Sequence, residues 1–123
     1  MQTEIQSYRD LKVWSAAMDL AEACYRATAG FPMDERFGMT SQIRRSATSV
    51  AANIAEGHGR ESTGAFVQGL RIAQGSLKEL ETHLILCRRI GLMQIVHCDE
   101  LLEACDEIGR MLRGLIRRLQ DKT

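Results

Sequence analysis

The sequence predicts an all-α fold, an antiparallel up-down-up-down four-helix bundle, on three observations. Apolar residues recur at alternating spacings of three and four in four successive segments, which places them along one side of a helix. The chain has a single proline and only 5% aromatic residues, and its valines and isoleucines do not alternate as they would in strands. The breaks between the segments are short, so consecutive helices must run antiparallel.

The length of 123 residues and the mass of 13.8 kDa suit one domain over residues 1–123, with helices at about 8–28, 40–56, 63–90 and 98–120. Each helix is expected to bury one apolar stripe on a seven-residue repeat, which favours packing at small crossing angles. The four stripes, in chain order, are Leu11, Trp14, Met18, Ala21 and Tyr25; Ile43, Ala47, Val50 and Ile54; Phe66, Leu70, Ala73, Leu77, Leu80, Leu84 and Cys87; and Leu101, Cys105, Ile108, Leu112, Leu115 and Leu119.

Residues that break or cap helices mark the ends of these segments. Gly30–Pro32 separates the first two helices, because proline lacks the amide hydrogen that a helix interior needs. Gly57–Gly59 is expected to end the second helix, with Gly57 as its cap in the left-handed conformation. Ser62 or Thr63 can accept a hydrogen bond from the free amides that begin the third helix, and Gly91 ends it.

The fourth helix has its charges sorted by sign along its length. Acidic residues occupy its first half and basic residues its second half and tail, an order that complements the helix dipole. They are Asp99, Glu100, Glu103, Asp106 and Glu107, then Arg110, Arg113, Arg117, Arg118 and Lys122.

Small residues gather in the second and third helices. Pairing the two helices about the Gly57–Gly59 turn would bring Ile54 opposite Phe66 and Ala47 opposite Ala73. Two glycines inside the third helix, Gly69 and Gly75, each cost about 1 kcal/mol relative to alanine. We interpret them as marks of close helix packing, the alternative being a surface that another backbone touches.

Four motifs together resemble a known family. Gln42–Gly57, with the sequence QIRRSATSVAANIAEG, is similar to the signature of the four-helix-bundle proteins encoded in intervening sequences of bacterial 23S ribosomal RNA genes. Leu11–Trp14, Phe31–Gly38 and Ala73–Glu81 also resemble that family, so the similarity covers about Leu11 to Leu119. The resemblance implies a four-helix bundle, commonly assembled as a ring of five, and no enzyme activity. A distant relative accompanies the reverse transcriptase of diversity-generating retroelements and is thought to bind nucleic acid.

Composition narrows the functional classes. Sixteen basic and 16 acidic residues give a net charge of zero, which excludes a uniformly basic nucleic-acid binder. The longest stretch without a charge, Ser46–Ala55, has ten residues, against the roughly 20 that a membrane helix needs. The amino terminus has no signal-peptide pattern, so we expect a cytoplasmic protein. Reduced thiols are then favoured over disulfides for Cys24, Cys87, Cys98 and Cys105.

Three arginine doublets are candidates for contact with a nucleic-acid backbone or a protein partner. A guanidinium group suits bidentate contact with phosphate or carboxylate, and clustered arginines can make a local positive face on a neutral chain. The alternative is ion pairing within the bundle or between subunits, with Glu79 and Glu81 predicted to lie near the first doublet when the second and third helices pair. The doublets are Arg44 and Arg45, Arg88 and Arg89, and Arg117 and Arg118.

The family motif also includes a set of polar or turn-forming residues, for which we favour a structural role. Asn53 is expected to satisfy backbone groups and Gly57 to cap the helix. The functional alternative is a polar site at the end of the bundle, with His58 and Arg60 nearby. The set consists of Gln42, Asn53, Glu56, Gly57 and Glu79.

No catalytic residue, cofactor, metal ion or small-molecule substrate is predicted, because no nucleophile–base pair or phosphate-binding loop is recognisable. The nearest pattern to a metal site is His83 and Cys87 at helical spacing, with Cys105 expected near the level of Leu84. Zinc would need a fourth ligand, and both cysteines occupy ordinary core positions, so packing is the favoured interpretation.

The favoured function is that of an oligomeric scaffold that acts through self-association and partner binding. The alternative is that a ring-shaped homo-oligomer binds the backbone of RNA. The four stripes leave out many apolar residues, and a second apolar face on a small helical protein is typical of a partner surface. These residues are Val13, Ala17, Ile72, Ile85, Leu86, Ile90, Leu102, Met111 and Ile116.

Overall fold

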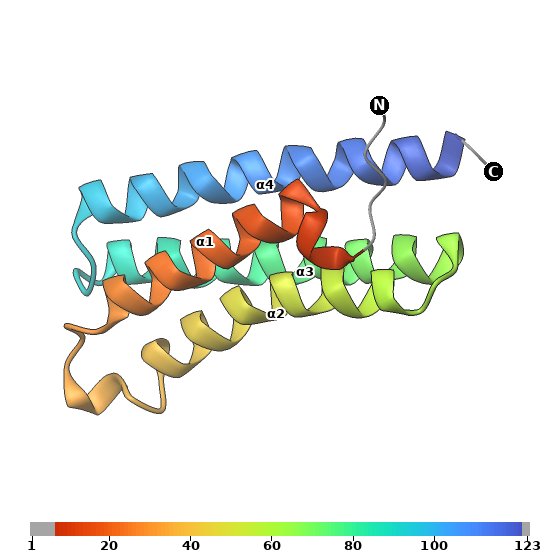
Figure 1. Ribbon diagram of the computed structural model, residues 1–123. Coiled ribbons are helices and arrows are strands. Elements are labelled where there is room, and N and C mark those ends of the chain that lie inside the picture. Colours follow the sequence, from red (N-terminus) through yellow and green to blue (C-terminus); the bar gives the residue numbers. More distant parts are fainter. Residues whose placement is uncertain (1–6, 122–123) are drawn as a thin grey trace.

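The computed structural model describes residues 7–121, and over this range it is a four-helix bundle without strands, which confirms the predicted fold class. Consecutive helices alternate in direction along the bundle (Figure 1). The elements are the 3-10 helix η1 (Tyr8–Asp10), α1 (Lys12–Thr28), the 3-10 helix η2 (Met33–Glu35), α2 (Met39–Gly59), α3 (Thr63–Arg89) and α4 (Ile95–Asp121).

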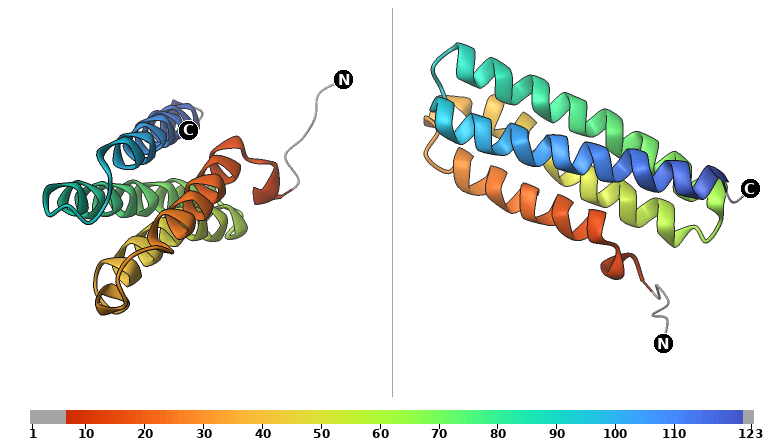
Figure 2. Two further views of the ribbon diagram at one scale, coloured as in Figure 1. Left: turned by 90° about the vertical axis from the view of Figure 1, so that its left-hand side faces the viewer. Right: turned by 90° about the horizontal axis from the view of Figure 1, so that it is seen from above.

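The helices pack in the order of the chain, and α4 closes the arrangement against α1. The contact between α2 and α3 is the most extensive, and that between α1 and α4 is the least. Among the described residues α2 and α4 do not pack against each other, so they occupy diagonal corners of the bundle (Figure 2). Their outer sides therefore face in different directions.

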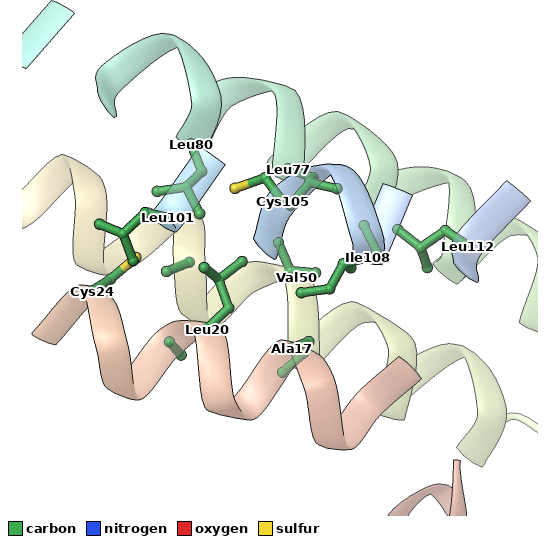
Figure 3. Packing of buried hydrophobic residues seen from close by; sticks show 14 of the residues in the cluster. Ala17, Leu20, Cys24, Val50, Leu77, Leu80, Leu101, Cys105, Ile108 and Leu112 are labelled. Atoms are coloured by element: carbon green, nitrogen blue, oxygen red, sulfur yellow. The ribbon is translucent and has the colours of Figure 1, made fainter. Parts of the chain in front are cut away.

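The core is formed mainly by the predicted stripes of α2, α3 and α4 (Figure 3). The α2 stripe is fully buried, and so is the α3 stripe apart from Phe66, which is half-buried. In α4 the stripe is buried as far as Leu112, whereas Leu115 and Leu119 are half-buried and Ile116 takes the core position instead. The three-and-four spacing thus identified most of the residues that leave water on folding.

The predicted stripe of α1 is right for Leu11 and Ala21, which are buried, and wrong for its three larger residues. The helix buries Val13, Ala17, Leu20 and Cys24, whereas Tyr25 of the predicted stripe is 45% exposed. Met18 is also exposed and Trp14 is half-buried. Both series have helical spacing, and the one with the smaller residues faces the core.

The aromatic side chains of α1 find partners at the surface instead. The ring of Tyr8 meets Trp14 edge-on with centroids 5.2 Å apart. The guanidinium of Arg44 lies over the ring of Tyr25, 4.5 Å from its centroid. Such contacts stabilise a ring that remains partly hydrated.

Two helix boundaries predicted from glycine and sequence spacing differ in the structure. The second helix does not end at Gly57: α2 continues to Gly59, and the left-handed residue is Glu61, with φ of 62°. The fourth helix begins at Ile95, about one turn earlier than 98. At the start of α3 the predicted cap is present, since the hydroxyl oxygen of Ser62 accepts a hydrogen bond from the amide of Ala65 at 3.2 Å.

The remaining boundaries follow local chain geometry. Leu11 has an extended backbone, so the expected first helix divides into η1 and α1. Gly91 follows α3 with φ of 76°, as predicted for a residue that ends a helix in the left-handed conformation.

Candidate functional site

Two glycines let α2 and α3 touch backbone to backbone. A Cβ atom added to Gly69 would lie 2.7 Å from the carbonyl oxygen of Asn53 and 2.8 Å from the Cα of Gly57. A Cβ atom on Gly57 would lie 3.0 Å from the Cα of Gly69. Gly57 is therefore a packing residue inside α2 rather than its cap. The prediction of close packing holds for Gly69 but not for Gly75, which has no atom within 4 Å of an added Cβ.

A chain of polar side chains crosses from α2 to α3 beside this contact. The hydroxyl oxygens of Ser49 and Ser76 are 2.9 Å apart. Asn53 donates its amide hydrogens to the carbonyl oxygen of Ser49 at 2.8 Å and to its hydroxyl oxygen at 3.0 Å. As predicted, Asn53 satisfies a backbone group.

The same contacts fix the register of the α2–α3 pair. Ser49 faces Ser76, and Gly57 faces Gly69. The predicted juxtapositions, Ile54 with Phe66 and Ala47 with Ala73, are therefore offset by about one and a half helical turns.

The predicted polar residues do not converge on one site. Asn53, Glu56 and Gly57 line a small pocket of about 90 Å³ with Arg60 and Gln68. Within it Glu56 accepts from Arg60 at 3.1 Å, and both side chains are exposed.

The other two motif residues lie elsewhere. Gln42 is eleven residues before Asn53, about 16 Å along α2, and accepts from Arg45. Glu79 approaches His83 on α3, with 3.8 Å between Oε2 and Nε2. His83 Nε2 is buried without a hydrogen bond.

Arg44 joins α2 to the end of α1. Its Nε donates to the hydroxyl of Thr28 at 2.9 Å, and its Nη2 donates to the carbonyl oxygen of Tyr25 at 3.3 Å. Thr28 in turn donates to the carbonyl oxygen of Cys24. The positive charge sits at the carboxyl end of α1, where the helix dipole favours a cation. Arg44 therefore has hydrogen-bond and ring contacts within the fold, all of them to the last turn of α1.

The predicted ion pairs between the first doublet and the third helix are wrong. Glu81 pairs with Lys78 at 3.2 Å, and Glu79 lies beside His83. Arg45 is exposed, and its hydrogen-bond partner is the neutral Gln42. Counted from the Ser49–Ser76 contact, Glu81 is level with Arg44, so the pair is absent because the guanidinium of Arg44 turns toward α1.

The other two doublets lie toward opposite ends of the bundle. Arg88 donates to Asp99 at 2.8 Å and so fastens the end of α3 to the start of α4. Arg89 beside it is exposed, as are Arg117 and Arg118 near the carboxyl end of α4. The three doublets therefore do not form one continuous face (Figure 1).

All four cysteines are buried free thiols. Burial raises the pKa of Cys24 to about 12 and that of Cys87 to about 11, so both remain protonated at neutral pH. Burial also raises the pKa values of Cys98 and Cys105. These thiols pack as small apolar groups rather than acting as nucleophiles.

The predicted neighbourhood of Cys105 is wrong. Cys98, not Cys105, lies at the level of Leu84, where its thiol donates to the Leu84 carbonyl oxygen at 3.3 Å. Cys105 lies farther along α4, beside Leu77 (Figure 3). Within residues 7–121 no group of three or more His, Cys, Asp and Glu side chains could hold a metal ion.

Comparison with known proteins places the fold in a family. The family model described as 23S rRNA-intervening sequence protein matches residues 9–114. The chain belongs to the 23S rRNA-intervening sequence protein family. The similarity of sequence motifs is thus confirmed over nearly the whole bundle.

A solved structure supports the assignment to the 23S rRNA-intervening sequence protein family. It is a protein with unknown function from the S23 ribosomal protein family of Bacteroides thetaiotaomicron VPI-5482, with a TM-score of 0.76 and 27% identity. The match covers 85% of this chain and 97% of that one. No curated protein matches the chain. Neither the family description nor the solved structure indicates an enzymatic activity.

This family member exposes five large apolar residues at one end of the bundle, of which the sequence interpretation named Ile90 and missed the other four. Both the α1–α2 and the α3–α4 connections lie at the same end of the bundle (Figure 1). We call this end the apolar end, after five side chains that are 59–83% exposed: Met33, Phe37, Ile90, Ile95 and Val96. The sequence feature that could have indicated this end is the presence of large apolar residues in the two connections.

The predicted second apolar face is only partly present. Val13, Ala17 and Ile116 are core residues, and Leu102 and Met111 are half-buried against the core. The exposed members of that set are Ile72, Ile85, Leu86 and Ile90. No helix in the described part of the chain is long and apolar enough to span a membrane.

Proposed function

We propose that this protein acts by self-association, as a non-enzymatic scaffold in which copies of the bundle form a ring and present a surface to a partner. Five copies is the number that the family resemblance implies. Four free thiols fit the reducing cytoplasm as its location.

The apolar end carries this proposal. Phe37 is 83% exposed, Met33 73%, Val96 65% and Ile95 63%, and all lie at one end of the same bundle. Leaving large apolar side chains in water is unfavourable by about 25 cal/mol for each Å² that a partner could cover. Exposed apolar side chains gathered at one end of a small protein are typical of protein–protein contact surfaces.

Light scattering coupled to gel filtration tests the proposal at micromolar concentrations. We expect a mass that is a multiple of the 13.8 kDa of one chain. Phe37→Glu should lower that mass, because it places a charge on the apolar end. Thr82→Glu, at an exposed position on α3, is the matched control. A wild-type protein that elutes as a monomer would reject self-association.

Nucleic-acid backbone binding is a second candidate, favoured by the free arginines near the end of α4. Arg117 and Arg118 are exposed and make no ion pair within the described residues. In a ring, several weak phosphate contacts of this kind would add through multivalency.

Fluorescence anisotropy with a labelled single-stranded RNA at two salt concentrations tests this candidate. We expect affinity that falls with salt, and a smaller salt dependence for the double variant Arg117→Gln, Arg118→Gln. Arg71→Gln, on the exposed side of α3, is the control. Absence of binding at low salt would remove the candidate.

A further inference from the structure

The outer side of α4 carries three carboxylates followed by three guanidinium groups, all exposed. At spacings of three and four they form one line along the helix: Asp99, Glu103, Asp106, Arg110, Arg113 and Arg117. Asp99 pairs with Arg88, and Arg110 pairs with Glu107. The other four make no ion pair within residues 7–121, so their charges face solvent without a partner.

The outer side of α2 has the opposite order of charge. Its exposed line begins with the basic Arg45, continues through the small Thr48 and Ala52, and reaches the acidic Glu56. Arg45 makes no ion pair among the described residues. Small side chains in the middle of a helix surface leave room for the longer side chains of another helix.

Contacts through α3 give the relative heights of α2 and α4 along the bundle. Ser49 of α2 meets Ser76 of α3, and Cys98 of α4 meets Leu84 of α3. Ser76 and Leu84 are eight residues, about 12 Å, apart along α3. Because α3 and α4 are antiparallel, Ser76 is level with a residue near Asp106 of α4. Ser49 therefore has the height of Asp106.

Opposite charges on the two outer sides consequently share the same heights. The helices α2 and α4 run in the same direction (Figure 1). Arg45, about one turn before Ser49, has the height of Glu103, and Glu56 has the height of Arg113. At the apolar end, Phe37 shortly precedes α2 and Ile95 begins α4, so these exposed side chains also have similar heights.

In a ring whose rotation axis runs along the bundle, every copy stands at the same height and a different face meets each neighbour. We infer that the α4 side of one copy packs against the α2 side of the next, with the bundles parallel. Arg45 then faces Glu103 and Asp106 of the neighbour, Glu56 faces Arg113, and Phe37 meets the start of α4. This inference rests on the proposed self-association and specifies the two faces that form the contact.

Charge reversal, followed by analytical ultracentrifugation, tests the pairing. Arg45→Glu and Glu103→Arg should each weaken association by roughly tenfold or more, because each places like charges opposite one another. The double variant with both changes should recover most of the wild-type association. Arg71→Glu makes the same change in net charge on α3, away from both faces, and should associate as the wild type does. Circular dichroism verifies that each variant keeps its helices.

The outcomes separate this inference from the proposed function. If the wild type assembles and Arg45→Glu assembles equally well, the α2 face is not in the contact and the inference fails while self-association stands. If Glu103→Arg weakens association and Arg45→Glu does not, α4 pairs with a second α4 in antiparallel orientation, which also overturns it. A monomeric wild type overturns both.

Discussion

Gly69 has no space for a side chain, and the obstructing atoms belong to the backbone. An added Cβ would lie 2.7 Å from the carbonyl oxygen of Asn53, and two helices cannot separate locally without losing neighbouring contacts. We predict that Gly69→Ala lowers the free energy of unfolding by about 1–3 kcal/mol. Gly75→Ala, on the exposed side of the same helix, should raise it by about 0.5–1 kcal/mol.

Urea unfolding of both glycine variants at one protein concentration measures the difference. The pair controls for helix propensity, because alanine is the better helix former at either position. Equal stability of the two variants would show that α2 and α3 can move apart at this point.

The thiol of Cys24 gives the stability a dependence on alkaline pH. Burial raises its pKa from 9.0 to about 12, so the unfolded chain loses this proton first. Above pH 9 the unfolded state binds fewer protons than the folded state, and the free energy of unfolding falls as pH rises toward 12. The largest slope from one thiol is about 1.4 kcal/mol per pH unit.

Chemical unfolding between pH 8 and 10.5 detects this slope. We predict a shallower decrease for Cys24→Ala than for the wild type. Val50→Ala likewise removes buried side-chain atoms, here two methyl groups, but keeps the thiol, so it should lower stability equally at each pH. Identical slopes in the wild type and Cys24→Ala would contradict the assignment.

At the scale of single elements, α3 depends on one capping side chain. The hydroxyl oxygen of Ser62 accepts from the amide of Ala65 at 3.2 Å, and Thr63 is the first residue inside the helix. We predict that Ser62→Ala costs about 1 kcal/mol of unfolding free energy. Thr63→Ala should change it by less than about 0.5 kcal/mol, as for an ordinary surface position. Thermal unfolding of the two variants side by side makes the comparison.

The elements also show which features the sequence could and could not predict. Helix number and most of the core followed from the spacing of apolar residues, because burial of one side imposes that period. In α1 two overlapping series have the same period, so the period does not say which one remains outside, where Tyr25 and Trp14 contact Arg44 and Tyr8. Gly57 is a glycine near the end of its helix, which is typical of a cap. Its role in packing depends on Gly69, a residue that becomes adjacent only in the fold.

The candidate functional residues were less predictable than the core for the same reason. Arginine doublets are visible in a sequence, but the partners of Arg44 and Arg88 come from other helices. The α2–α3 register also differs from the predicted one, yet Glu81 is level with Arg44 in the structure, and the predicted pair is absent because Arg44 turns toward Thr28 and Tyr25 of α1. Helical spacing specifies which residues share a side, and it leaves the axial position of a neighbouring helix open.

At the scale of the whole molecule, a net charge of zero conceals a separation of charge between the ends of α4. Summed composition therefore cannot reveal whether two copies attract each other. Arg45 and Glu103 lie at the same height on diagonal helices, so they would attract each other when two copies stand side by side in parallel. Burial of the exposed apolar end would add to the stability of that contact.

Self-association of the folded chain should make its thermal stability depend on concentration. An assembly that forms only from folded copies shifts the unfolding equilibrium by mass action, so the apparent Tm rises as protein is added. We predict this rise between about 1 and 100 µM for the wild type and for Arg71→Glu, and a smaller rise for Arg45→Glu. Differential scanning calorimetry over this range measures it. A Tm independent of concentration in the wild type would mean that the bundle reaches its full stability as a single copy.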